Sequence, residues 1–226
     1  MPVFSRPRAL VFDVNETLLD MSPVKQAFLE TFDTEFAFTY WFSLMLQYSL
    51  VDTVSGSYHT FPQIGEAVLK MTTEFFNRPL SEEVQKQLLH TMAHLPPHPD
   101  VEDGLQQLRQ AGFRLAALTN SPGDSLSQHM QQTGLGHYFE GLWTVDDVQV
   151  FKPSPKTYQL ALSRLGLGPQ ETMMVAAHGW DIAGAARVGM QTAFIARNGQ
   201  SVYPLATPAT LTGDTVGAIA RQLIAH

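Results

Sequence analysis

The sequence contains no cysteine. Without thiols the chain can form no disulfide, no thiolate zinc site and no cysteine nucleophile. Any nucleophilic chemistry must therefore come from another side chain.

Basic residues are also few. The chain has 14 Lys and Arg against 21 Asp and Glu, which gives a formal net charge of −7 at pH 7. Nucleic-acid phosphates are held by clustered Lys and Arg, and the sequence shows no basic stripe. We therefore expect no nucleic-acid partner.

Long hydrophobic runs are missing as well. The most apolar uncharged stretch, 36–51 (FAFTYWFSLMLQYSLV), is shorter than the roughly 20 apolar residues that span a bilayer, and it contains Thr, Ser and Gln. The opening MPVFSRPRALVFDV lacks the apolar region and small-residue cleavage site of a signal peptide. These features predict a cytoplasmic protein with no membrane partner.

Four short apolar runs are present, and each is followed by a polar loop and a helical pattern. They cover 9–14 (ALVFDV), 114–120 (RLAALTN), 172–178 (TMMVAAH) and 191–197 (QTAFIAR). Runs that are apolar on both faces are typical of a parallel sheet covered by helices. Strands that alternate with helices predict a doubly wound α/β fold.

Helices with readable ends lie between these runs. In HPDVEDGLQQLRQAG, Asp100 is the expected N-cap and Gly112 the stop. In KPSPKTYQLALSRLGLG, Ser154 is the expected N-cap, and the helix should end at Gly166 or Gly168.

The segment 22–95 has no convincing strand, only helical stretches such as PVKQAFLETF and SEEVQKQLLHTMAHL. The proline-rich LPPHPD marks the return to the sheet. We expect a helical cap domain at 22–95, inserted between the two parts of an α/β core domain at 1–21 and 96–226. Ligands in open α/β sheets bind outside the carboxyl ends of the strands, and a lid there excludes water.

Polar side chains follow the apolar runs directly, so this topology should gather them at one crevice. A carboxylate, a hydroxyl, an ammonium and a second carboxylate are the parts of a nucleophilic site. A positive charge beside the first carboxylate would keep it ionised. The residues are Asp13 and Asn15 from the first run, Thr119 and Asn120 from the second, Lys152 from VQVFKPSP, and His178 and Asp181 from MMVAAHGWD.

These residues resemble the motifs of the haloacid dehalogenase (HAD) superfamily: a strand ending in D-x-x-x-T, a strand ending in Thr or Ser, a Lys, and an acidic fourth motif. The resemblance runs from Ala9 to about Arg197 in the family's order. It is closest to the type II 2-haloacid dehalogenases. LTNSP looks like their Ser/Thr-Asn turn, VQVFKPSPKTY like their Lys-Pro segment, GWDIAGA like their Trp-Asp segment, and YWFSLMLQYSL like their aromatic cap helix.

The resemblance implies a Rossmann-like HAD core and hydrolysis through a covalent aspartyl ester, with Asp13 as the nucleophile. It also implies supporting roles at six other positions. Thr17 orders the loop, Thr119 and Asn120 orient the carboxylate and hold the acid group of the substrate, Lys152 neutralises charge, Tyr158 supports the site, and Asp181 positions or activates the water.

Position 15 separates two chemistries of this superfamily. Most HAD phosphatases have a second Asp there as general acid for the leaving alkoxide, and Asn15 cannot serve as one. A halide leaves without a proton. The sequence therefore favours dehalogenation of a small 2-haloalkanoic acid, with inversion at carbon and no cofactor.

Two alternatives stay open. One is a phosphatase of a small phosphorylated metabolite that uses Mg²⁺ held by Asp13, Asp181 and waters, although Ala177 replaces the first acid of the fourth motif. The other is a non-catalytic HAD-fold binding protein. The unusual residues that motivate it are Asn15, Phe42, Ala176 and Ala177.

The halide-binding group of the dehalogenase hypothesis is also open. Type II enzymes usually have an Arg in the cap helix where this chain has Phe42. They also usually have Tyr at the place of Asn15, and Ser and Asn at the places of Ala176 and His178. Halide stabilisation must then come from Asn15, Trp41, His178 or backbone N–H groups.

His178 has two interpretations. It is either a water-activating or substrate-binding base beside Asp181, or a helix-capping residue that hydrogen-bonds the loop.

The aromatic residues of the cap fall into two groups by their expected role. Most should form the cap core, while Trp41, Phe42 and Tyr48 are candidates to line an apolar substrate pocket. The aromatic, charge-poor cap leaves a homodimer open.

Overall fold

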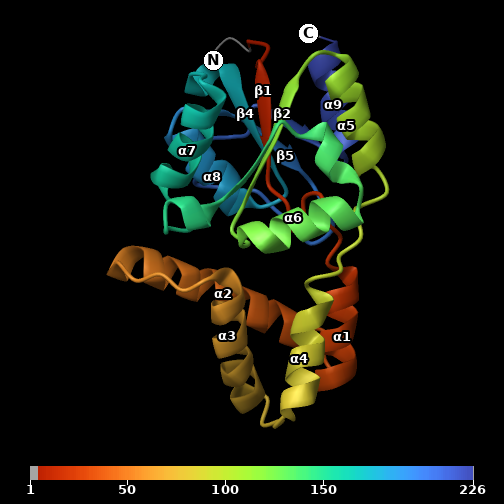
Figure 1. Cartoon of the computed structure of the whole chain (residues 1–226), viewed down its shortest axis with the longest axis vertical. Coiled ribbons are helices and arrows are strands. Elements are labelled where there is room, and N and C mark those ends of the chain that lie inside the picture. The colour runs from red at the N-terminus through yellow and green to blue at the C-terminus, as the bar shows by residue number, and fades with distance from the viewer. Residues whose placement is uncertain (1–4, 226) are drawn as a thin grey trace.

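The computed structural model describes residues 5–225, so the first four residues of the expected core segment and the last residue lie outside it. A parallel sheet of six strands, in the order β3-β2-β1-β4-β5-β6, forms the centre of the core (Figure 1). Its strands are β1 (Ala9–Phe12), β2 (Arg114–Thr119), β3 (Gly141–Thr144), β4 (Thr172–Ala176), β5 (Gln191–Ile195) and β6 (Leu211–Gly213).

The four apolar runs are strands, as predicted, and they occupy the four central positions of the sheet. Two edge strands, β3 and β6, had not been predicted. Both are short, and β6 has no buried residue. A short, half-exposed edge strand lacks the two-sided apolar pattern that marks a central one.

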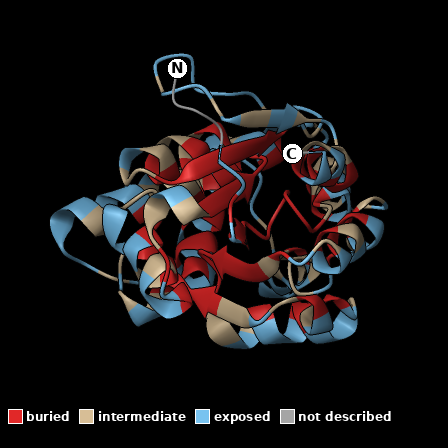
Figure 2. Cartoon of the chain, turned by 90° about the horizontal axis from the view of Figure 1, so that it is seen from above, coloured by how far each residue is buried: buried red, intermediate tan, exposed pale blue. Residues whose placement is uncertain are grey.

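Alternate residues of β1 explain why its run is apolar throughout. Leu10 and Phe12 pack into a core cluster that also contains Leu105 and Ile219. Ala9 and Val11 pack into a second cluster on the opposite face. Figure 2 shows the strands buried between layers of helices.

Helices cover both faces of this sheet (Figure 1). On one face lie α5 (Val101–Gln110) and α9 (Val216–Ile224), and on the other lie α7 (Pro155–Leu165) and α8 (Gly179–Arg187). The helix α6 (Gly123–Gln132) follows β2 at the carboxyl end of the sheet. The order of strands and helices confirms the predicted doubly wound α/β fold.

The predicted helix ends are also found. Gly112, with φ +86°, follows the end of α5, and Gly166, with φ +64°, ends α7. Asp100 and Ser154 occupy the N-cap positions, but neither side chain caps its helix. Asp100 instead accepts from Arg197 and from the backbone N–H of Val216.

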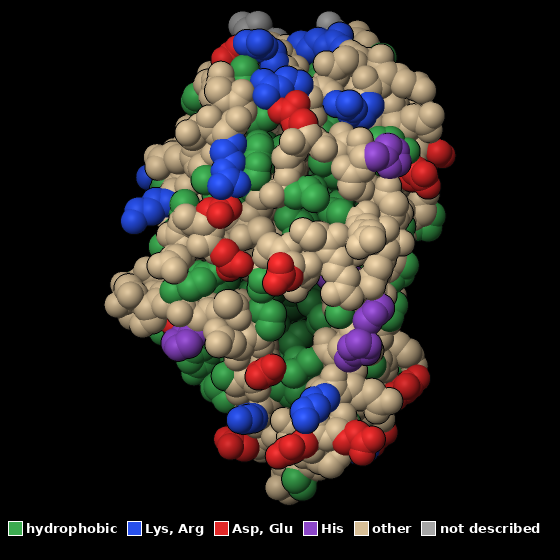
Figure 3. Space-filling view, viewed as in Figure 1, with side chains coloured by type: hydrophobic (Ala, Val, Ile, Leu, Met, Phe, Trp, Pro, Cys, Tyr) green, Lys and Arg blue, Asp and Glu red, His purple; other side chains and the backbone are tan. Residues whose placement is uncertain are grey.

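Four helices fill the interval in which no strand was predicted. They are α1 (Ser22–Phe32), α2 (Phe36–Ser55), α3 (Phe61–Phe75) and α4 (Glu82–Thr91), and they lie together beyond the carboxyl ends of the strands (Figure 1). Their interior is aromatic: the ring centroids of Phe28 and Trp41 are 4.8 Å apart. Between these helices and the core, Figure 3 shows a hollow lined by hydrophobic side chains.

The two connections between these parts run side by side. Asp20 N–H donates to Pro96 O at 2.8 Å, and His98 N–H donates to Leu18 O at 2.9 Å. We propose that this paired crossing marks the domain boundaries, with a core at 1–21 and 96–226 and a cap at 22–95.

Within residues 5–225, no helix is both long enough and apolar enough to span a lipid bilayer. Leu50, Val51 and Val54 near the end of α2 are exposed. Nothing covers them in the single chain, and the homodimer stays a prediction.

Candidate active site

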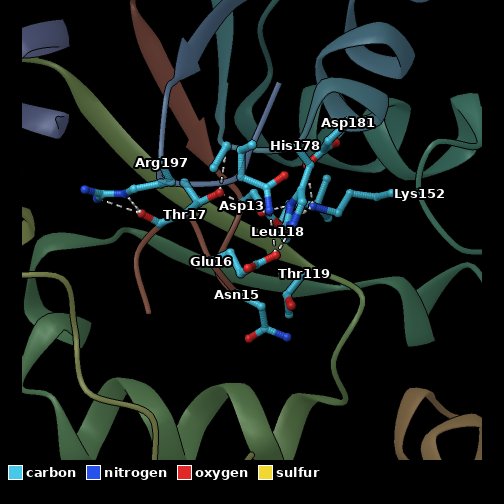
Figure 4. Close-up of polar contacts among 12 residues, drawn as sticks. Asp13, Asn15, Glu16, Thr17, Leu118, Thr119, Lys152, His178, Asp181 and Arg197 are labelled. Atoms are coloured by element: carbon cyan, nitrogen blue, oxygen red, sulfur yellow. Dashed lines mark hydrogen bonds and ion pairs between the residues drawn. The ribbon is translucent and has the colours of Figure 1, made fainter. Parts of the chain in front are cut away.

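The predicted polar site residues of the core lie at the carboxyl ends of the central strands, on the side of the sheet that faces the cap helices (Figure 1), and Figure 4 shows Asp13, Lys152, His178 and Asp181 gathered there. Asp13 directly follows β1, and its N–H continues the ladder by donating to Val175 O at 3.0 Å. Thr119 is the last residue of β2. His178 and Asp181 stand at the start of α8, and Lys152 lies in the loop before α7.

Lys152 joins the two carboxylates of the site. Its Nζ donates to Asp13 Oδ1 and to Asp181 Oδ2 at 2.7 Å each, and to Leu118 O at 3.0 Å. An ammonium has three donors, and all three are used. Burial alone would lower the pKa of Lys152, but the charges of Asp13 and Asp181 outweigh burial and raise it. The group is therefore a fixed cation.

Asp13 is held ionised although it is buried. Burial raises its pKa, but the positive charge of Lys152 and the bond from His178 more than reverse that effect and hold the pKa below its usual range. Thr17 Oγ1 donates to Asp13 Oδ2 at 2.7 Å and accepts from Ala177 N–H at 2.9 Å. Thr17 thus fixes both the carboxylate and the loop that carries it.

The pKa of Asp181 is shifted in the opposite direction to that of Asp13. Burial and the negative charge of Asp13 raise its pKa against the opposing effect of Lys152. Tyr158 donates its hydroxyl proton to Asp181 Oδ1 at 2.7 Å. Tyr158 is buried behind Asp181, so it contacts the site through that carboxylate.

His178 bridges two carboxylates. Its Nδ1 is 3.0 Å from Asp13 Oδ2, and its Nε2 is 3.0 Å from Glu16 Oε2. Burial lowers the pKa of His178, but these two partners raise it to about 9. At neutral pH the ring is therefore an imidazolium whose two N–H groups are both engaged. His178 occupies the N-cap position of α8, yet its side chain does not cap that helix.

The charge of His178 should make folding stability pH-dependent. Its pKa is about 9 in the folded protein against an ordinary value of 6.5, so the stabilisation is fully present below about pH 6.5 and is lost as pH rises through about 9. Urea unfolding at pH 6 and pH 9.5 should show a fall in unfolding free energy of the order of 3 kcal/mol. In His178→Gln this fall should nearly disappear, whereas the exposed-residue control His137→Gln should keep it. An unchanged fall in His178→Gln would contradict the assignment.

The comparison with known proteins identifies the family. The sequence model of the haloacid dehalogenase-like hydrolase family matches residues 7–189. The chain belongs to this family. It is therefore an enzyme, a hydrolase.

Dehalogenases are prominent among the relatives and structural neighbours of this HAD-like hydrolase, and a HAD phosphatase from Thermococcus onnurineus is a more distant structural neighbour, with a TM-score of 0.63 at 26% identity. The chain is 31% identical over 194 residues to (S)-2-haloacid dehalogenase 2 from Pseudomonas sp. (strain CBS-3), covering 84% of each chain. It is 27% identical over 213 residues to haloacetate dehalogenase H-2 from Moraxella sp. (strain B), covering 93% of this chain and 95% of that one. The crystal structure of an L-2-haloacid dehalogenase has a TM-score of 0.93 at 25% identity, covering 97% of this chain and 99% of that one.

Glu16 is a site residue of this HAD-like hydrolase that sequence reasoning missed. It is buried, and besides His178 it accepts from Lys25 Nζ at 2.8 Å and from Gln200 Nε2 at 3.0 Å. Burial raises its pKa, but the bond from His178 and the contact with Lys25 lower it below the usual value. Its partners come from α1, from α8 and from the loop after β5, so no local spacing in the sequence could have indicated them.

A small cavity of about 10 Å³, the space of about one water molecule, adjoins Asp13. Asn15, Thr119 and Asn120 line it from the core, and Phe42 and Phe61 from the cap. Tyr158 and Thr17 lie behind the reactive groups and do not line this cavity. Trp41 does not line it either, and it donates Nε1–H to Gly65 O at 3.0 Å inside the cap.

Mg²⁺ between Asp13 and Asp181 does not fit this donor set. The position between the two carboxylates is taken by Lys152 Nζ, which is 2.7 Å from an oxygen of each. Among residues 5–225, no group of three or more His, Asp or Glu side chains is arranged to hold a metal ion. The metal ligation considered for the phosphatase alternative is therefore not supported by the geometry.

Proposed function

We propose that the chain hydrolyses the carbon–halogen bond of small 2-haloalkanoic acids through an ester formed on Asp13. The observation that carries this proposal is an ionised, buried carboxylate held by Lys152 beneath a cap, with an amide side chain two residues later. Such a site supplies a nucleophile, and the amide of Asn15 cannot protonate a leaving alkoxide as the second Asp of HAD phosphatases does. The (S)-2-haloacid dehalogenase relative supports the same substrate class.

In the first step, an Asp13 carboxylate oxygen attacks C2 of the substrate on the side opposite the halogen. A C–O bond forms, the C–X bond breaks, and the halide leaves with the bonding electrons. C2 inverts and becomes the alcohol carbon of an aspartyl ester. Lys152 and Thr17 keep the carboxylate ionised and aimed, so the attacking group is oriented in advance.

In the second step, water attacks the ester carbonyl carbon of Asp13. Esterification removes the negative charge of Asp13, which leaves Lys152 paired with Asp181 alone. Asp181 accepts one proton of the attacking water. As the bond between the ester carbonyl carbon and the oxygen on C2 breaks, Asp181 passes this proton to the leaving alkoxide oxygen, the second proton of the water is released to solvent, and the 2-hydroxy acid leaves as the Asp13 carboxylate re-forms. One oxygen of that carboxylate then comes from water.

Two hydrogen-bond donors, one on the last residue of β2 and one on the residue that follows it, are placed to bind the substrate carboxylate. Thr119 Oγ1 accepts from Ser121 N–H, so its own proton is free to be donated toward the cavity. Asn120 Oδ1 accepts from Lys152 N–H at 3.1 Å, which leaves the NH₂ group as the end available to a ligand. We assign both residues to the acid group.

Most of the side-chain N–H groups considered as halide donors already have hydrogen-bond acceptors. Trp41 Nε1–H and both N–H groups of His178 already have acceptors. Asn15 Nδ2 has one bond, to Ser121 Oγ at 3.2 Å, and its Oδ1 is buried without a partner among the described residues. Turning this amide by half a turn would let the Ser121 hydroxyl donate to Oδ1 and would leave Nδ2 as the end without a partner. We propose the Asn15 amide, beside the Phe42 ring, as the halide donor.

Halide release tests the proposal. We expect (S)-2-chloropropanoate to yield chloride and (R)-2-hydroxypropanoate, with no change on addition of EDTA. Absence of halide release from (S)-2-chloropropanoate and from haloacetates, by folded enzyme, would refute dehalogenation. Release of p-nitrophenol from its phosphate that requires Mg²⁺ would instead favour the phosphatase.

A small-molecule substrate is the partner that this function requires. A cytoplasmic location and a homodimer stay predictions from the sequence.

A further inference from the structure

Two larger cavities adjoin the small cavity at Asp13, and their linings differ in polarity. One, of about 600 Å³, is lined by charged groups that include Glu16, Lys25 and Glu35. The other, of about 240 Å³, lies between the cap and α6, and we call it the apolar pocket. Trp41, Met45, Phe61, Leu89, Met92 and Pro122 supply its apolar lining.

The residues that separate each of these two cavities from the cavity at Asp13 are held in place by different contacts. The charged cavity shares Phe42, Leu46 and His178 with the cavity at Asp13. His178 is fixed there by contacts to Asp13 and Glu16, both 3.0 Å long. Opening that wall would break two ion pairs in a buried place, which is strongly unfavourable.

The apolar pocket shares Asn15 and Phe61 with the cavity at Asp13. Asn15 is held through one side-chain bond of 3.2 Å and has an unpartnered buried oxygen among the described residues. In Figure 4 its side chain points away from the cluster of Asp13, Lys152 and His178. Moving this side chain aside breaks one hydrogen bond and no ion pair. The apolar pocket is therefore the extension of the reactive cavity that opens more easily.

We propose that the apolar pocket receives the carbon chain attached to C2 of the substrate. This inference rests on the proposed function and specifies its substrate class: 2-halo acids with an unbranched apolar chain of several carbons. The pocket volume of about 240 Å³ is about 24 times that of the cavity at Asp13, which is about 10 Å³. A chain of four to six methylene-sized groups would fill much of it.

Chain length is the variable that tests this proposal. Each methylene buried in an apolar site should raise kcat/KM about fourfold, until the pocket is full. We expect kcat/KM for halide release to rise from 2-bromopropanoate through 2-bromohexanoate to 2-bromooctanoate. A steep fall beyond the three-carbon acid would overturn the proposal.

A pair of variants on α6 localises the effect. Ser125 lines the apolar pocket, whereas Ser127 on the same helix is exposed and does not. Ser125→Phe should lower the ratio of kcat/KM for 2-bromooctanoate to that for bromoacetate by tenfold or more. Ser127→Phe should leave this ratio unchanged. An equal ratio in both variants would contradict the assignment.

A second filling variant and a binding measurement complete the test. Ala93→Phe fills the same pocket from the chain after α4 and should act as Ser125→Phe does. If bromoacetate releases bromide but the chain-length ratio is flat, the pocket proposal fails and the proposed function stands. If no haloacid releases halide, the proposed function fails. Calorimetric binding of octanoate against acetate, to wild type and Ser125→Phe, then decides the pocket proposal by itself, and equal affinities would overturn it.

Discussion

Asp13→Asn will abolish halide release, lowering kcat by about 10⁴-fold or more. The amide keeps the shape of the side chain but carries no negative charge to attack C2. The fold should survive, because Lys152 keeps its partner Asp181 at 2.7 Å. Halide release should be measured beside Asp214→Asn, an exposed aspartate near the start of α9, as the matched control. Substantial activity in Asp13→Asn would contradict the nucleophile assignment.

Oxygen labelling separates a covalent mechanism from direct attack of water on C2. In a single turnover in heavy-oxygen water, ester hydrolysis places the label in the Asp13 carboxylate, while the hydroxyl of the first product carries unlabelled oxygen. Direct attack by water places the label in the product. Mass spectrometry of the peptide containing Asp13 distinguishes them, and labelled product with unlabelled peptide would exclude the ester.

Much of the fold and the reactive cluster could be predicted because both depend on strongly local signals. The central strands are buried on both faces and therefore read as apolar runs, and the polar residues that end them share one edge of a parallel sheet. Asp13, Lys152 and Asp181 meet there as expected, joined by bonds of 2.7 Å. The edge strands β3 and β6 lacked this signal because they are short and partly exposed.

The network around Glu16 could not be predicted, for a different physical reason. Its partners His178 and Gln200 are 162 and 184 residues away in the chain, so their meeting depends on the tertiary fold. The protonation of His178 follows from the same network. Its ordinary pKa is near working pH, and the carboxylates of Asp13 and Glu16 raise that pKa to about 9. Neither interpretation of His178 from the sequence included a residue bonded to two carboxylates.

Lys152→Met should strongly destabilise the protein at neutral pH. The change removes the cation that separates Asp13 and Asp181 and leaves two buried carboxylates, with His178 beside only the first. Breaking a buried pair in this way typically costs about 3–5 kcal/mol. Lys156→Met is the matched control, because Lys156 is an exposed lysine in the first turn of α7, just after the loop that carries Lys152. Urea unfolding of both variants and of the wild type at pH 8 measures the loss of unfolding free energy in each variant.

The pH dependence of that loss identifies its cause. Without Lys152, one buried carboxylate should have a folded-state pKa raised above its unfolded value. The contribution of such a group to the free energy of unfolding is fully present below its pKa in the unfolded chain and is lost as pH rises through its pKa in the folded protein. The unfolding free energy of Lys152→Met should therefore fall short of that of Lys156→Met by less at pH 5 than at pH 8, because protonation removes the buried negative charge. An equal deficit at both values would mean that Lys152 stabilises the core by packing, and that its ammonium does not govern the charge of Asp13.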